Sequence, residues 1–134
     1  MCLAVYIACD NTLPLIKWDA KQPRFNVVPL DHNDKVVTCQ FRYPYVLYAG
    51  SHEGCGCGFI KEGEVGEQLE MVQSNYKQLA SYLQKLRTSG YNIEIFVCWE
   101  GGQGAEPELR QRISVETLVM EGFEFQEKTY YEIE

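Results

Sequence analysis

Apolar residues along the chain form several short extended patterns and one long helical one. Residues 3–9 (LAVYIAC) are apolar on both faces of an extended chain, which predicts a central strand. Residues 45–49 and 92–99 are rich in aromatic and β-branched residues and predict two further buried strands. Residues 123–133 alternate apolar with polar positions, the pattern of a strand with one solvent-facing side.

One long amphipathic helix is predicted over residues 64–88. Apolar residues recur there at spacings of four and three: Val65, Leu69, Val72, Tyr76, Leu79, Leu83 and Leu86. Acidic residues lie in its first turns and basic residues in its last, as the helix dipole favours, and Gly90 supplies a C-terminal cap. Because this stripe lies between two predicted strands, we expect it to cover a sheet rather than to form a coiled-coil seam.

Three shorter segments complete the pattern. Residues 25–28 predict a strand that Pro29 restricts to the sheet edge, since proline cannot donate to a strand ladder. Residues 35–43 fit either a strand or a short helix. Ser114 predicts the N-cap of a short helix that Gly122 closes.

Together these elements predict an α+β fold, with residues 1–134 forming a single domain. The expected sheet is mixed or antiparallel and has about five strands, and the long helix and the short helix pack on one of its faces. A length of 134 residues is typical of one domain. A hydrophobic content of 46% is sufficient to fill its core.

Composition narrows the partners and the compartment. With 19 acidic and 12 basic residues the net charge is -7, the wrong sign for binding a phosphate backbone, so we expect no nucleic-acid partner. No segment has the roughly 18 consecutive apolar residues of a membrane span, so we expect the protein not to associate with a membrane. The first nine residues lack the basic start of a signal peptide, which predicts a cytoplasmic protein with six reduced cysteines. Whether the partner is a small molecule or a protein is left open by the sequence.

Residues 50–58 (GSHEGCGCG) hold most of the candidate chemistry. Four of these nine residues are glycine, so the backbone can approach a ligand closely. Thiolate and imidazole groups are zinc and iron ligands, so His52, Cys55 and Cys57 predict a metal site. A fourth ligand has to come from elsewhere, and four residues are candidates for it: Cys9, Cys39, Glu53 and Cys98.

Two alternatives use the same loop. In the first, Cys55 or Cys57 is a nucleophile or redox thiol, His52 is its base and the second cysteine resolves it, which predicts a thiol-dependent oxidoreductase or transferase. In the second, the cysteines are small apolar fillers in a structural loop, and the chain is a non-catalytic interaction module.

Glu53 and Glu100 are candidates for binding a ligand at the sheet edge. Glu100 begins the sequence EGGQG (100–104), which lacks the spacing of a phosphate-binding loop and favours a solvated turn. If strands 45–49 and 92–99 run parallel, the loops that follow them leave the same edge and can form one site. If residues 57–61 return as an antiparallel strand, the two loops lie at opposite ends of the sheet.

Overall fold

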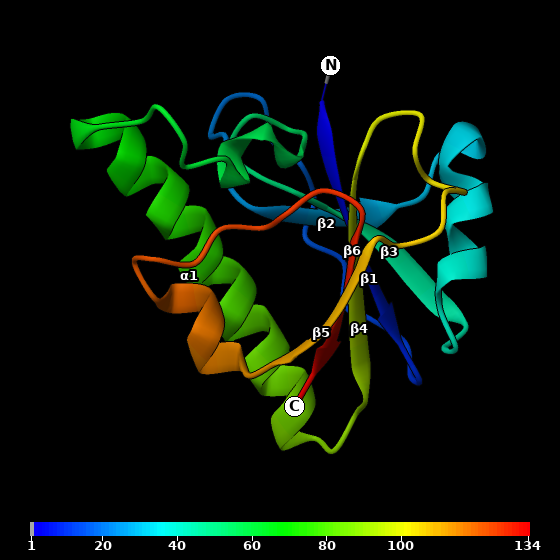
Figure 1. Ribbon diagram of the computed structural model, residues 1–134. Helices are drawn as coiled ribbons and strands as arrows, with labels where there is room; N and C mark the ends of the chain where they lie inside the picture. The colour runs from blue at the N-terminus through cyan, green and yellow to red at the C-terminus, as the bar shows by residue number, and fades with distance from the viewer. Residues whose placement is uncertain (1) are drawn as a thin grey trace.

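A six-stranded sheet with helices on both faces forms the framework of the protein (Figure 1). The computed structural model describes residues 2–134. The strands are β1 (Leu3–Cys9), β2 (Asn26–Pro29), β3 (Tyr45–Gly50), β4 (Ile93–Trp99), β5 (Leu109–Ile113) and β6 (Thr129–Ile133). Their order is β2-β3-β1-β4-β6-β5, and all neighbours are antiparallel except β5 and β6. The predicted α+β fold and mixed sheet are confirmed, with one strand more than expected.

Strand β1 lies in the middle of the sheet, and all seven of its residues are buried. It pairs antiparallel with β3 on one side and with β4 on the other. Strands β3 and β4 therefore run parallel to each other, and both end beside the start of β1. This arrangement confirms that the loops after Gly50 and after Trp99 leave the same edge of the sheet.

Helices cover the two faces of the sheet unequally. Helix α1 (Gly66–Thr88) and the short 3-10 helix η3 (Val115–Val119) lie on one face, as predicted, and the 3-10 helix η1 (His32–Gln40) lies on the other (Figure 1). The core under α1 contains most of the buried apolar side chains. The core under η1 is smaller and consists of Ala4, Tyr6, Val37, Phe96, Cys98 and Tyr130, with a few half-buried neighbours.

The apolar stripe of α1 is buried along most of its length. Val72, Tyr76, Leu79, Leu83 and Leu86 pack in the core. Val65 and Leu69, by contrast, are 78% and 37% exposed. The reason is geometric, because the first turns of α1 project away from the sheet (Figure 1). None of the helices within residues 2–134 combines the length and the hydropathy needed to cross a lipid bilayer.

Local structure decides one open alternative and departs from the predicted pattern in two places. Residues 35–43 prove mostly helical, because η1 extends to Gln40 and is capped by the Asp31 carboxylate, which accepts hydrogen bonds from two backbone amides. Strand β5 was not predicted, because only Ile113 of its five residues is buried. Strand β6 is shorter than predicted, and Phe125, which precedes it, packs in the core from an irregular segment.

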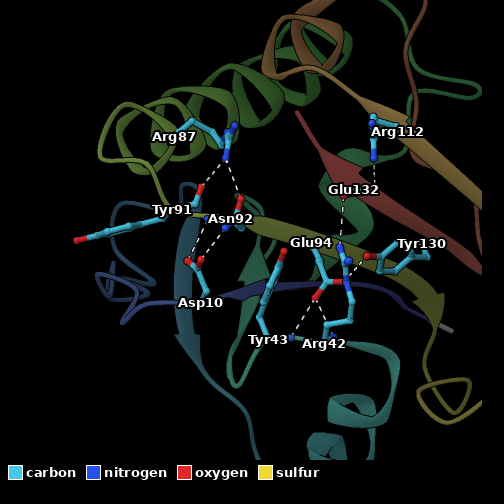
Figure 2. Close-up of polar contacts among 10 residues, drawn as sticks. All are labelled: Asp10, Arg42, Tyr43, Arg87, Tyr91, Asn92, Glu94, Arg112, Tyr130 and Glu132. Atoms are coloured by element: carbon cyan, nitrogen blue, oxygen red, sulfur yellow. Dashed lines mark hydrogen bonds and ion pairs between the residues drawn. The ribbon is translucent and has the colours of Figure 1, made fainter.

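A fully buried carboxylate fastens the connection between η1 and β3 to the sheet. Glu94 of β4 accepts hydrogen bonds from the backbone amides of Arg42 (3.0 Å) and Tyr43 (3.2 Å). It also accepts from the Arg42 Nε (3.3 Å) and from the Tyr130 hydroxyl. Figure 2 shows these four donors converging on the one carboxylate. Protein donors, rather than water, thereby compensate the charge of the buried Glu94 carboxylate.

Candidate metal centre

Three cysteine thiols meet at the sheet edge where β3 and β4 end. Cys2 immediately precedes β1, and Cys55 and Cys57 lie in the loop that follows β3. Their Sγ atoms all lie within 4.8 Å of one another. A tetrahedral zinc ion with Zn–S bonds of about 2.3 Å holds its sulfurs about 3.8 Å apart, so small side-chain adjustments bring these thiols to bonding distance. The three-thiol group, Cys2, Cys55 and Cys57, can hold a metal ion.

Ser51 folds the glycine-rich loop back on itself. Its buried hydroxyl donates to the Cys55 carbonyl (2.6 Å) and accepts from the backbone amides of Gly58 (3.0 Å) and Glu53 (3.2 Å). The loop then enters the short 3-10 helix η2 (Gly56–Phe59), which Cys55 caps: its Sγ accepts from the Cys57 amide at 3.4 Å. The Cys55 thiol is therefore held by the backbone of its own segment.

Close contact between this loop and β1 requires glycine at position 56. A Cβ atom added to Gly56 would lie 2.5 Å from the Leu3 carbonyl oxygen, which is backbone of the central strand and cannot move aside cheaply. We expect Gly56→Ala to lower the free energy of unfolding by about 1–3 kcal/mol, the usual cost of overpacking. Gly122→Ala is the matched control, because no atom lies within 4 Å of its added Cβ. Urea unfolding of both variants checks this, and equal stabilities would contradict the close contact.

Asn75 of α1 connects the loop to the helix. This side chain is 1% exposed; its Oδ1 accepts from the His52 amide (3.1 Å), and its Nδ2 donates to the Gly58 carbonyl (3.0 Å). These two backbone partners fix the orientation of the amide, so the Nδ2 also donates to the His52 Nδ1 at 2.7 Å. The geometry thus assigns the lone pair to Nδ1 and, in the neutral ring, the proton to Nε2.

His52 lies outside the three-thiol group. Its Nδ1 is occupied by Asn75, and its Nε2 lies 3.8 Å from a Glu53 carboxylate oxygen. Of the predicted set of His52, Cys55 and Cys57, the structure brings the two cysteines together and adds Cys2. A role for His52 as a ligand or base stays a prediction.

The other three cysteines lie away from this group. Cys9 packs in the core under α1, and Cys98 packs under η1 on the opposite face, as the alternation along their strands predicts. Cys39 is exposed on η1. Within residues 2–134, then, none of these candidates for a fourth ligand joins the three-thiol group.

Burial raises the pKa of the Cys55 thiol. Desolvation raises the pKa of Cys55 to about 12, against the opposing effect of the Cys57 amide that donates to its sulfur. Cys55 in the metal-free protein is therefore a neutral thiol at physiological pH and a poor nucleophile. A metal ion that binds here displaces the proton, since the ligand is the thiolate.

Glu100 lies beside the thiols, at the end of β4. Its backbone amide donates to the Cys2 carbonyl at 2.8 Å, and its carboxylate accepts from the Gln103 Nε2 at 2.9 Å. A cavity of about 370 Å³ opens here and is lined in part by Tyr48, Gly54 and Glu100. The two loops therefore share one site region. Glu53, which is exposed, is not among the cavity's lining residues, and ligand binding by Glu53 or Glu100 stays a prediction.

A buried polar network adjoins this cavity, because Asp34 both lines the cavity and belongs to the network. The Asp34 carboxylate of η1 accepts from the Tyr6 hydroxyl (2.9 Å) and from the Gln103 Nε2 (3.2 Å). Burial raises the pKa of Tyr6 far above its usual range, so its hydroxyl stays a donor. The sequence 100–104 is therefore not simply a solvated turn, because Gln103 is buried and ties it to η1. A glutamine in a glycine-rich turn gave no signal of this role.

The chain matches no protein-family model, and comparison with curated proteins and with solved structures gives no match either.

Proposed function

We propose that the protein binds one zinc or iron ion through the thiolates of Cys2, Cys55 and Cys57. The observation that carries this proposal is the mutual approach of three Sγ atoms from two separate chain segments. Thiolate sulfurs are soft ligands that favour zinc and iron over hard cations such as magnesium or calcium. The Cys57 amide that donates to the Cys55 sulfur would also stabilise the bound thiolate.

Metal binding fits these side chains better than thiol catalysis. A nucleophilic cysteine needs a base within hydrogen-bonding reach. His52, the predicted base, has its Nδ1 occupied by Asn75 and faces Glu53 with its Nε2. These contacts favour a ligand role for the cysteines over a nucleophilic one.

Metal content and cobalt affinity test this proposal. Protein purified without a histidine tag is expected to contain near-stoichiometric zinc or iron, and the metal-free protein to give a sulfur-to-cobalt charge-transfer band with Co²⁺. We expect Cys2→Ser, Cys55→Ser and Cys57→Ser each to weaken Co²⁺ binding by more than the roughly 10–100-fold that loss of a supporting contact costs. Cys39→Ser, which changes an exposed cysteine of η1, is the matched control and should bind normally.

Each of the other outcomes would support a different ligand set or a different function. Binding that survives Cys2→Ser but is lost in His52→Ala would restore the ligand set of His52, Cys55 and Cys57. Metal-free protein with no Co²⁺ band and two rapidly reacting thiols would support the oxidoreductase or transferase alternative. Absence of the band with every thiol silent until unfolding would make the loop structural and support an interaction module.

A further inference from the structure

A groove lies along α1 and shares no lining residue with the three-thiol group. It has a volume of about 500 Å³ and runs between the segment that precedes β2 and the second half of α1. Its apolar floor is formed by Ile16, Phe25 and Tyr82. The Phe25 and Tyr82 rings meet edge to face with centroids 6.1 Å apart, so the floor is packed rather than fluid.

The walls of the groove are also fixed. Ile16 exchanges two backbone hydrogen bonds with Val27 of β2, both of 2.9 Å, which anchors the segment to the sheet. The Tyr82 hydroxyl donates to the Pro14 carbonyl at 2.7 Å and joins α1 to the same segment. A groove with both walls held in this way requires little ordering when a ligand enters, which lowers the entropic cost of binding.

Two basic side chains line the groove, one from each wall. Arg24 comes from the wall before β2, and Lys85 comes from α1. Both are exposed, and neither takes part in an ion pair of residues 2–134. The chain carries 19 acidic residues against 12 basic ones, yet no acidic residue is among those that line this groove.

We propose that this groove binds a small organic anion with an apolar body, namely an aromatic or aliphatic carboxylate. The apolar floor would contact the body, and Arg24 and Lys85 would bind the carboxylate at the rim. The volume lies within the range of small-molecule sites, which are mostly apolar with a few polar groups that orient the ligand. The guanidinium of Arg24 can bind a carboxylate through two parallel hydrogen bonds. This proposal is independent of metal binding at the thiols.

Titration with a matched pair of probes tests the proposal. The acid is 4-phenylbutyrate and the neutral control is 4-phenylbutanamide, which has nearly the same shape. Both are added to the full chain and followed by the amide signals of a ¹H–¹⁵N correlation spectrum. We expect the acid to shift the signals of residues around Phe25 and Tyr82 saturably. The amide should bind about tenfold more weakly, because it forms neither ion pair. Added salt should weaken the binding of the acid only.

Variants of the two cations make the test specific. Arg24→Gln and Lys85→Gln should each weaken binding of the acid by about three- to fivefold and leave binding of the amide unchanged. Lys77→Gln changes an exposed lysine of the same helix that does not line the groove, and should have no effect. All three positions are exposed, so we expect the variants to fold.

Three results would overturn the proposal. The first is equal affinity for acid and amide, which would mark the groove as a purely apolar docking surface. The second is acid binding that Arg24→Gln and Lys85→Gln leave unchanged. The third is an absence of saturable shifts around the groove at acid concentrations up to the millimolar range, which corresponds to a binding free energy of only about -4 kcal/mol.

Discussion

Replacing Glu94 by alanine is expected to lower the free energy of unfolding by about 3–5 kcal/mol. The carboxylate is fully buried and accepts from two backbone amides, from the Arg42 side chain and from the Tyr130 hydroxyl. Removing it leaves the partly buried amides of Arg42 and Tyr43 without their acceptor, and an unpaired donor shielded from water costs about 1–3 kcal/mol. Urea unfolding at neutral pH measures the loss.

Two further variants separate this role from surface charge. Glu132, on the neighbouring strand, pairs with Arg42 and Arg112 at a site that is largely exposed (Figure 2). We expect Glu132→Ala to cost no more than about 1 kcal/mol, as surface ion pairs do. Glu94→Gln keeps one carbonyl acceptor and should fall between the two. A loss for Glu94→Ala as small as that for Glu132→Ala would show that water replaces the carboxylate without penalty.

The elements that could be predicted from sequence are those in which local pattern and burial agree. Strand β1 is apolar at every position because it is covered on both faces, and α1 presents an apolar stripe because one side packs on the sheet. Strand β5 could not be predicted, since it is exposed along four of its five residues and pairs only with β6. Its place depends on a long-range parallel pairing that leaves no alternation in the sequence.

The candidate site divides in the same way. Cys55 and Cys57 are visible as neighbours in a glycine-rich loop, whereas Cys2 joins them only because β1 pairs antiparallel with β3. Asn75 left a fainter signal, as a polar residue adjacent to Tyr76 within the apolar face of α1. A buried amide on such a face requires partners, and these turned out to be the backbone groups of the loop.

Asn75→Ala is accordingly expected to affect both the stability of the fold and the position of the loop. Its removal leaves the His52 amide and the Gly58 carbonyl without their partners, so we expect unfolding of the metal-free protein to require about 2–4 kcal/mol less. Ser74→Ala, at the exposed neighbouring position of α1, is the control and should stay within about 0.5 kcal/mol of the parent. Equal stabilities for the two variants would show that the loop holds its shape without the helix.

The same variant also measures how far the helix positions the proposed metal ligands. Asn75 touches no thiol, but it fixes both sides of the segment that carries Cys55 and Cys57. If those thiols hold a metal ion, Asn75→Ala should weaken Co²⁺ binding by about 10–100-fold, the usual effect of a supporting contact. His52→Ala removes the imidazole but keeps the hydrogen bond from the backbone amide of residue 52 to the Asn75 Oδ1. Normal Co²⁺ affinity in His52→Ala, with weak binding in Asn75→Ala, would assign the effect to the loop backbone, whereas a loss in both would assign it to the histidine ring.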